Sequence, residues 1–493
     1  MVFRKIVLRF FALTVLLIGM NFIYVLFFLE QDLQHFAPIV NSIRAIPKDS
    51  KILYIGESSN VTISLEDLDQ RPISELLNEH YPSLRIAQLT QAAAHAGIFK
   101  TLLENVDPQT EIETVVVTLN LRSFNAEWIY SGLETPLRKT ALLLEDRPAL
   151  MNRFLLSFKH YPAYTEKERF DLIQSEWEAQ DLALPKNFPY KNVIQWRDAV
   201  DRIGLKNARG ERDHKRTQLA YEFISSYAFR IDLKNNPRIA DLNDIIDLAK
   251  KRNWNLVFNL MAENTDMAEE LLGPELLSII RDNRKLLVDY FTKKKVTVVD
   301  NLELIRNADF VDKEWPTEHY NQHGRRMIAA NLAQAIQKFH KKDYAPVDNV
   351  HFFNDCEGQL PWANLHTLSS KQAASGKKSS CTDLQNEYSI NFRFPFEQLP
   401  DKARNKVHVK MMVQGTTFNG ETLLVMDVRR KNGEHYWKSV ALNELTRQKK
   451  DWQTITHTFD LSPVHSDGEF IEIYVYNQSK KILYVDDIDI LFQ

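Results

Sequence analysis

Short, almost uninterrupted apolar runs alternate with longer amphipathic stretches between residues 45 and 342. The clearest run, Thr114–Leu119, is β-branched and apolar almost throughout, which is typical of a strand buried on both faces. Four further runs have the length and composition of strands: Ile52–Ile55, Leu84–Leu89, Leu256–Leu260 and Val296–Val299. Such strands separated by helical stretches predict an α/β domain with a five-stranded parallel sheet and right-handed crossovers.

One long segment of this domain, about residues 125–253, has no strand of comparable quality. Its patterns predict helices around 136–156, 166–183, 192–203 and 241–252. We interpret it as a helical insertion between the third and fourth strands. It either forms a lid or wall over the carboxyl edge of the sheet or is a packing elaboration without a role in binding.

From about residue 350 the pattern changes to alternating apolar and polar positions, which predicts half-buried antiparallel strands. Six such runs lie at 388–394, 406–413, 422–429, 452–461, 470–476 and 482–491. Asn432-Gly433 between two of them is a strong hairpin signal. This density of strands predicts a carboxy-terminal β-sandwich over 350–493, with the boundary near Lys341–Pro346.

The amino terminus carries an apolar run from Phe10 to Leu29, preceded by Arg4, Lys5 and Arg9. About 20 apolar residues suffice to cross a bilayer as a helix. The run is longer than the core of a cleaved signal peptide and has no small-residue cleavage pattern, so we expect residues 1–30 to be an uncleaved transmembrane anchor. The basic residues precede the span, so the amino terminus is expected in the cytoplasm and the bulk of the chain outside.

Composition narrows the function further. The formal charge of −3 argues against a nucleic-acid partner, which would require a concentrated basic excess. The 14 glycines among 493 residues, and the lack of any zinc, P-loop or dinucleotide motif, argue against a metal or nucleotide cofactor. The two cysteines, Cys356 and Cys381, lie close together in sequence, and an oxidising compartment would favour a disulfide between them, with two free buried thiols as the alternative.

Three polar residues follow strands or precede the last helix of the α/β domain. Ser58 comes two residues after Gly56 at the end of the first strand, and Asn120 directly follows the third strand. His319 lies in a loop ahead of an amphipathic helix, 325–339. The carboxyl ends of parallel strands share one edge, where ligands bind in open α/β sheets. The pattern therefore predicts a serine nucleophile, an amide donor to an oxyanion and a histidine base.

These residues resemble the sequence blocks of SGNH (GDSL-type) hydrolases. Gly56-Glu57-Ser58 is similar to the Gly-Asp-Ser block, with Glu57 in place of aspartate, and His319–Gly324 is similar to the histidine block. The resemblance implies a flavodoxin-like three-layer fold, with Ser58 as nucleophile, Asn120 as oxyanion donor and His319 as base. The family glycine after the second strand is replaced in this region by Ala93 or Ala94, or is supplied by Gly97.

The acid of the triad departs from the family pattern. The family places it three residues before the histidine, where this chain has Pro316. We assign the role to Glu318, with Glu314 and Asp312 as the other nearby carboxylates and a Ser–His dyad as the alternative. Arg122 and Arg325 are candidates for binding an anionic group of the substrate.

The carboxy-terminal region resembles carbohydrate-binding jelly-roll modules in its closing segment, Tyr484–Ile490. The resemblance implies a structural calcium near Asp486 and Asp487 and suggests aromatic residues that stack on sugars: Trp362, Tyr436, Trp437 and Trp452.

The resemblance to anchored SGNH proteins of this layout implies that the chain is an esterase or O-acyltransferase. It would act on acyl esters of a cell-envelope polysaccharide, beside a multispanning membrane acyltransferase. The alternative is a catalytically inactive SGNH-shaped protein that binds polysaccharide or acts as a scaffold.

Overall fold

The computed structural model describes residues 2–158, 164–185, 188–358, 360–415, 418, 420–446 and 451–493. The chain divides into two compact units. Residues 1–63 and 71–345 form the first, and residues 64–70 and 346–493 form the second.

The first unit is built on a parallel sheet of five strands in the order β2-β1-β3-β4-β5. The strands are β1 (Ile52–Gly56), β2 (Ile86–Thr90), β3 (Thr114–Leu119), β4 (Asn255–Leu260) and β5 (Thr297–Asp300). Every pair of neighbours is parallel, with Ile52 of β1 opposite Ile86 of β2 and Thr114 of β3. The five strands predicted from the apolar runs are therefore confirmed.

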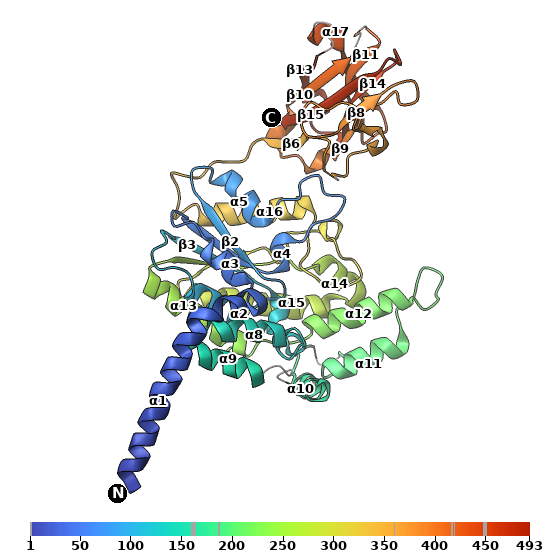
Figure 1. Ribbon diagram of the computed structural model, residues 1–493. Helices are drawn as coiled ribbons and strands as arrows, with labels where there is room; N and C mark the ends of the chain where they lie inside the picture. The colour runs from blue at the N-terminus through green and yellow to red at the C-terminus, as the bar shows by residue number, and fades with distance from the viewer. Residues whose placement is uncertain are drawn as a thin grey trace. The chain divides into compact units, whose positions relative to one another are not determined.

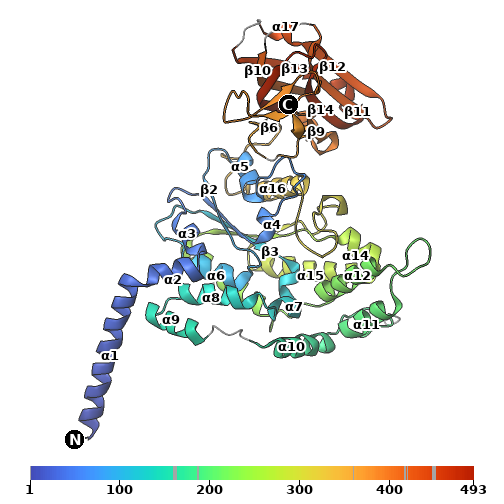
Figure 2. The same cartoon turned by 45° about the vertical axis from the view of Figure 1, so that its right-hand side comes forward.

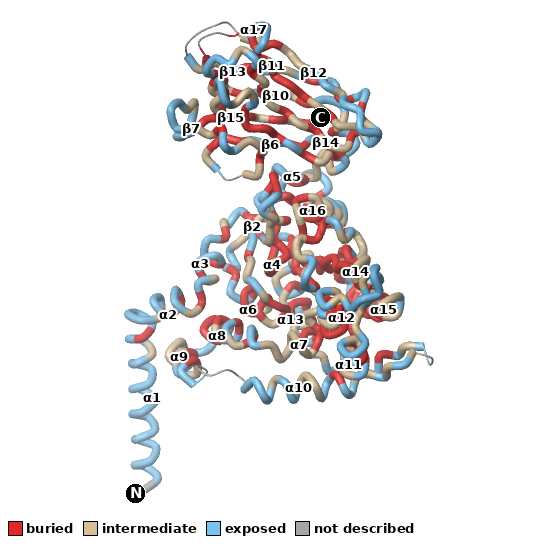
Figure 3. Tube along the Cα trace, turned by 90° about the vertical axis from the view of Figure 1, so that its right-hand side faces the viewer, coloured by how far each residue is buried: buried red, intermediate tan, exposed pale blue. Residues whose placement is uncertain are grey.

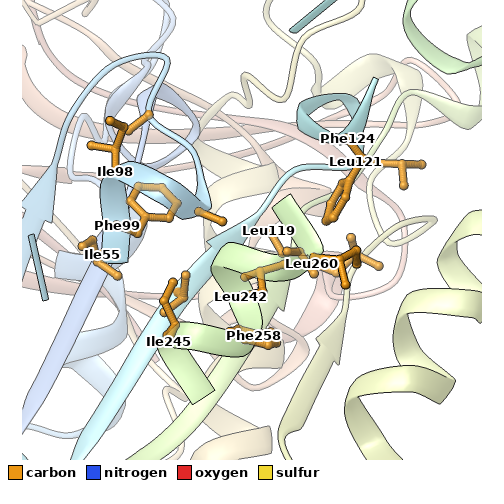
Figure 4. Packing of buried hydrophobic residues seen from close by; sticks show 14 of the residues in the cluster. Ile55, Ile98, Phe99, Leu119, Leu121, Phe124, Leu242, Ile245, Phe258 and Leu260 are labelled. Atoms are coloured by element: carbon orange, nitrogen blue, oxygen red, sulfur yellow. The ribbon is translucent and has the colours of Figure 1, made fainter. Parts of the chain in front are cut away.

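Helices cover both faces of this sheet (Figure 1). On β1, Leu53 and Ile55 face one hydrophobic core, whereas Ile52 and Tyr54 face another, because successive side chains of a strand point to opposite faces. One face is covered by α5 (Ile73–His80) and α16 (Gln322–Ile336), and the other by α6 (Ala96–Glu104), α13 (Pro237–Arg252) and α15 (Pro274–Lys293). Figure 4 shows the core under α6, α13 and α15, where Phe99, Leu242 and Phe258 pack between the sheet and these helices.

The segment between β3 and β4 is helical, as predicted. Its elements are a 3-10 turn η1 (Leu121–Phe124), α7 (Ala126–Ile129), α8 (Glu134–Leu144), α9 (Ala149–Phe158), α10 (Glu166–Ala179), α11 (Val193–Ile203), α12 (His214–Tyr227) and α13. The single helix expected around 136–156 is divided into α8 and α9, with Pro148 directly before α9, because proline cannot continue a helix. The sequence analysis missed α12, whose start is capped by the Asp213 side chain.

The remaining short helices of this unit are α2 (Leu29–Phe36), α3 (Ile39–Arg44), α4 (Ser58–Val61), α14 (Thr265–Leu272) and η2 (Asn307–Asp309). The amino-terminal helix α1 (Val2–Phe27) is exposed over most of its length (Figure 3), with Tyr24 buried near its carboxyl end. Its segment Phe3–Phe27 is long and apolar enough to cross a membrane, and no other helix among the described residues is. Only 6% of the most apolar 18-residue stretch of this segment is buried.

The second unit consists of antiparallel sheets. One sheet has the order β13-β10-β15-β8-β7, with β6 also paired to β15, and the other has the order β12-β11-β14-β9. Their strands are β6 (Val350–Asn354), β7 (Leu368–Ser369), β8 (Ser379–Thr382), β9 (Phe392–Pro395), β10 (Lys406–Gly415), β11 (Thr422–Arg430), β12 (His435–Ala441), β13 (Gln453–Asp460), β14 (Gly468–Asn477) and β15 (Leu483–Phe492). Short helical turns are η3 (Leu365–Thr367), η4 (Phe396–Gln398), η5 (Asp401–Arg404), α17 (Leu442–Leu445) and η6 (Ser462–Val464).

Side chains from both sheets enclose one core, among them Val409 of β10 and Ile473 of β14 (Figure 2 shows the strands). The predicted hairpin joins β11 to β12, with Gly433 at φ +85°, a conformation that glycine adopts without strain.

The expected disulfide is absent: both cysteines are free thiols. Cys356 belongs to the hydrophobic core, whereas Cys381 of β8 is opposite Tyr484 of β15 and only half-buried. Val485, next to Tyr484, points into the core, so Cys381 faces the other side of the sheet. The prediction was wrong because closeness in sequence did not place the two thiols on one face.

Candidate active site

Ser58 is presented by a sharp turn at the carboxyl end of β1. A side chain at Gly56 would meet Thr118 Oγ1 at 2.6 Å, so only glycine fits between β1 and β3 at this point. The next residue, Glu57, is extended and caps α4, and Ser58 is the first residue of that helix. The serine hydroxyl is therefore carried clear of the strand, at the edge where ligands bind in open α/β sheets.

His319 lies beside Ser58, and a carboxylate lies behind it. His319 Nε2 is 3.0 Å from Ser58 Oγ, and His319 Nδ1 is 2.6 Å from Asp312 Oδ2. The hydroxyl of Thr317 also donates to Asp312 Oδ2, at 2.9 Å. Serine, imidazole and carboxylate thus form a continuous chain of contacts, the arrangement that activates a serine nucleophile.

A short antiparallel pairing brings Asp312 back to His319 although seven residues separate them. Phe310 bridges to Tyr320, and the N–H of Val311 donates to the carbonyl of His319 at 2.9 Å. The intervening residues form a loop whose two ends are adjacent.

Glu318, which we assigned as the acid from the sequence, does not occupy that position. Its carboxylate is buried and accepts two hydrogen bonds from Arg122, one of them from Nε at 2.7 Å. Adjacent residues in extended backbone point in opposite directions, so Glu318 faces away when His319 faces Ser58. Asp312 contacts the imidazole instead.

Arg122 is committed to this buried pair and not free to bind an anion by itself. Its guanidinium also stacks on the ring of Trp128, 5.0 Å from the centroid. Glu263 lies in the same cluster, fully buried, and accepts a hydrogen bond from Tyr227 at 2.5 Å. Burial and the nearby Glu318 carboxylate hold the pKa of Glu263 well above its ordinary value.

Arg325 is not placed to bind a substrate, contrary to expectation. It is 0% exposed, and its guanidinium donates to the backbone carbonyls of Arg71, Thr62 and Tyr320 at 3.0, 3.3 and 2.8 Å. These bonds attach the start of α16 to the loop that follows α4. The sequence could not distinguish this arginine from an exposed one, because it lies near a helix start like many solvated arginines.

Asn120 follows β3 as predicted and lines the same cavity as Ser58 and His319. Its Oδ1 is buried without a hydrogen-bond partner among the described residues. The backbone N–H of Ser58 likewise has no acceptor in the described parts of the chain. An amide and a backbone N–H at one cavity are the donor types that stabilise an oxyanion.

Ala93 is one of the three residues considered as a second backbone donor. Its φ of +57° is left-handed, a conformation that costs a non-glycine residue about 1–2 kcal/mol, and it lines the cavity. Its N–H has no acceptor among the residues described. Gly97 is excluded as the donor, because its N–H already donates to His95 Nδ1 at 3.2 Å.

Glu57 is unusual in contacting the nucleophile. Its carboxylate accepts from the Ser58 hydroxyl at 2.8 Å and from the Ser59 N–H at 3.0 Å. One hydroxyl hydrogen cannot serve both Glu57 and His319, so the two compete for the proton of Ser58.

The cavity has a volume of about 530 Å³. Much of its wall comes from the helical insertion, so the insertion contributes to the site and is more than a packing elaboration. The residues supplied by the insertion are Glu127, Trp128, Ser131, Leu133, Glu222, Ser226 and Arg238. Apolar atoms make up most of the exposed surface of the wall, although polar and charged residues supply most of its side chains.

The aromatic residues expected to bind sugars are mostly unsuited to it. Trp362 is 2% exposed and packs on Phe392, and Tyr436 packs partly against the core. Trp452 is half-buried, and Trp437 on β12 is exposed. Around Trp437 lies a cluster that the sequence analysis missed, the tyrosines of β14 and of the segment before β9, Tyr388, Tyr474 and Tyr476.

The suggested calcium site does not fit the residues present. Asp486 Oδ2 accepts from the N–H groups of Ala374 and Ser375 at 2.7 and 3.3 Å, and Oδ1 accepts from the N–H of Asp487. Throughout the described ranges, no group of three or more acidic, histidine or cysteine side chains is placed to hold a metal ion.

No protein-family model matches the chain, and no curated protein matches it. Among solved structures, it is similar to the CBM22-1 xylan-binding domain of Paenibacillus barcinonensis Xyn10C (13% identity, 25% of this chain, 77% of that chain, TM-score 0.19). It is also similar to the C-terminal family 22 carbohydrate-binding module of Clostridium thermocellum Xyn10B (11%, 30%, 95%, 0.22) and to a family 16 carbohydrate-binding module (13%, 26%, 89%, 0.20). Likenesses with TM-scores this low do not bear on function.

Proposed function

We propose that the first unit is an SGNH-type esterase or O-acyltransferase, anchored by α1 and acting outside the cytoplasm on acyl esters of an envelope polysaccharide. The observation that carries this proposal is the chain of contacts from Ser58 through His319 to Asp312 at one cavity. The strand order 2-1-3-4-5 supports a flavodoxin-like sheet, in which ligands bind at the carboxyl edge.

The mechanism has two balanced steps. In the first, Ser58 Oγ attacks the acyl carbon while its proton passes to His319 Nε2; the ester C–O bond then breaks, and the departing alcohol takes that proton. In the second, water or a sugar hydroxyl gives its proton to Nε2 and attacks the acyl-serine, and Ser58 Oγ leaves with that proton. The Asn120 amide and the N–H of Ser58 are proposed to stabilise the oxyanion in both steps.

Two observations favour the alternative of an inactive SGNH-shaped protein. Glu57 competes with His319 for the serine proton, and Ala93 occupies a strained position. The contact between Asp312 and His319 removes the main sequence objection to catalysis, the missing acid at Pro316. We therefore retain the enzyme as the primary proposal.

Labelling with a fluorophosphonate probe tests this proposal. The full chain in detergent is expected to acquire one covalent adduct on the peptide that contains Ser58. Ser58→Ala and His319→Ala should both abolish the adduct and the hydrolysis of a chromogenic acetyl ester. Ser83→Ala, which removes an exposed hydroxyl of the same unit that bonds only Asp343, serves as the control and should label normally. Equal turnover by the wild type and both site variants would refute catalysis at this site.

We further propose that the second unit binds a glycan on the outer face of the four-stranded sheet. Tyr388 and Tyr476 stack with ring centroids 4.8 Å apart, and Tyr474 meets Tyr388 edge-on at 5.6 Å. Trp437 lies beside them and is 45% exposed. Val425 of β11 lies on the same outer face as Tyr474, which is opposite it, and is nevertheless fully buried. Exposed aromatic rings offer apolar faces on which sugar rings can stack.

Polar groups suited to sugar hydroxyls flank these rings. Asn391 has a buried Oδ1 with no partner within the described residues, and Glu472 pairs with Arg393 at 3.3 Å. Trp437→Ala should weaken binding of an acidic or neutral polysaccharide about tenfold or more, equivalent to about 1.4 kcal/mol, in affinity electrophoresis. Phe353→Ala changes an equally exposed aromatic of the other sheet and should leave the affinity unchanged. The same loss in both variants would contradict the assignment.

A further inference from the structure

Helix α9 has an apolar face that the described residues of the first unit leave exposed. Met151, Phe154 and Phe158 are 45%, 55% and 64% exposed, and their spacing places them on one side of the helix. The rings of Phe154 and Phe158 contact each other with centroids 4.7 Å apart. Asn152 and Leu156, on another side of the helix, are buried and attach it to the unit. Three neighbouring large apolar residues exposed on one short helix indicate a surface that meets a partner.

Specific contacts attach this helix to the carboxyl end of α1. The N–H of Leu150, in the first turn of α9, donates to Asn21 Oδ1 of α1 at 2.8 Å. Arg153 pairs with Asp32 of α2 at 2.8 Å, and Asp32 also accepts from the Tyr24 hydroxyl at 2.8 Å. Figures 1 and 2 both show α9 to one side of the part of α1 nearest the unit.

These contacts fix the position of α9 along the axis of α1. Asn21 lies six residues before Phe27, the last residue of α1, so at 1.5 Å per residue it is about 9 Å from the helix end. Helices that lie in a membrane interface bury their apolar face about 5–10 Å into the boundary between headgroups and acyl chains. If α1 spans the bilayer, α9 is therefore at interfacial depth.

The polar groups at this junction satisfy one another. An asparagine inside an apolar span is costly in a membrane unless it is hydrogen-bonded, and the first N–H groups of a helix have no partner within their own helix. The bond between Asn21 and Leu150 meets both needs.

We propose that the face Met151, Phe154 and Phe158 inserts into the outer surface of the bilayer that α1 crosses. The partner is the lipid surface, because the span of α1 brings it to this face. The inference rests on the proposed membrane anchor. The tether holds α9 at the surface, so a short interfacial helix contributes without strong affinity of its own. Attachment through both α1 and α9 keeps the cavity in a defined orientation above the membrane.

Photo-crosslinking in vesicles tests the proposal. The full chain is reconstituted in vesicles of phosphatidylcholine and phosphatidylglycerol, with benzoylphenylalanine replacing one residue at a time. The tested positions are Phe154 and Phe158. Phe10, within the span, is the positive control, and Leu384, a highly exposed residue of the second unit, is the negative control. Retained fluorophosphonate labelling or an unchanged proteolysis pattern confirms that each variant is folded.

Lipid adducts detected by mass spectrometry are expected at Phe10, Phe154 and Phe158, and not at Leu384. Adducts at Phe10 without any at Phe154 or Phe158 would overturn the inference while leaving the anchor intact. A lack of adducts at Phe10 would refute the anchor, and the inference with it. Crosslinks from Phe154 or Phe158 to protein and not to lipid would show that another chain covers this face, which also overturns the proposal.

Discussion

Replacing Asp312 by asparagine is expected to lower kcat for acyl-ester hydrolysis about 10⁴-fold, with little change in stability. The Asp312 carboxylate accepts the hydrogen of His319 Nδ1, which leaves Nε2 free to take the proton of Ser58. An asparagine amide can donate to Nδ1 and so favour the other tautomer, in which Nε2 already carries a hydrogen. The same change in a serine-protease triad costs about this factor. Initial rates with a chromogenic acetyl ester measure it.

A second carboxylate of the same loop provides the control. Glu314 is exposed and pairs only loosely with Lys215, at 3.4 Å, so Glu314→Gln should leave kcat unchanged. If Asp312→Asn retained nearly full activity, Asp312 would not be the residue that orients His319, and a Ser–His dyad would be the better description.

Replacing Arg122 by methionine is expected to destabilise the first unit by about 3–5 kcal/mol. Arg122 is the cation that faces the buried carboxylate of Glu318, and the side chain of Glu318 is only 2% exposed. Methionine keeps most of the volume but leaves a buried carboxylate without its ion-pair partner, which is far costlier than losing an exposed pair. The urea dependence of amide hydrogen exchange in β3 and β4 reports on this unit and not on the sandwich.

The effect should depend on pH in a defined direction. Arg122 lowers the pKa of Glu263, although burial keeps that pKa raised overall. Without Arg122, Glu263 stays protonated to higher pH in the folded unit, whereas in the unfolded chain it ionises above about pH 4.3. Both proteins therefore lose stability as the pH rises above that value, and the variant continues to lose it at pH values where Glu263 of the folded wild type has already ionised.

An exposed ion pair serves as the reference for this loss. Arg306 pairs with Asp266 at 3.3 Å and is 76% exposed, so Arg306→Met should cost at most about 1 kcal/mol. Equal losses of stability for Arg122→Met and Arg306→Met would show that burial does not determine how much the pair of Arg122 and Glu318 contributes to stability.

Local sequence signals were sufficient to predict the sheet and to place Ser58 and Asn120 at one edge of it. The β-branched run Thr114–Leu119 can be stable only where both faces are covered, which determines a central strand. Ser58 and Asn120 end neighbouring parallel strands, so their closeness follows from topology alone. The contact between His319 and Ser58 could not be derived in this way, because the position of a residue in a loop does not specify the direction of its side chain.

The acid could not be identified from spacing. Adjacency favoured Glu318, but alternation along an extended backbone turns it toward Arg122, and the bridge between Phe310 and Tyr320 brings the more distant Asp312 to the imidazole. Arg325 and Trp362 show the same limit. Both are buried by residues far away in the sequence, Arg325 by the loop around Arg71 and Trp362 by Phe392.

By itself, the sequence determined the features that depend on neighbours along the chain: the apolar length of α1, the strands, the glycine turn before Ser58 and the change to alternating strands after residue 350. Only the tertiary structure decided which side chains meet across the fold. Asp312 with His319, Arg122 with Glu318, Leu150 with Asn21 and the tyrosines around Trp437 are such pairs. The physical reason is that periodicity and propensity act over a few residues, whereas contact, burial and charge pairing depend on how distant elements pack.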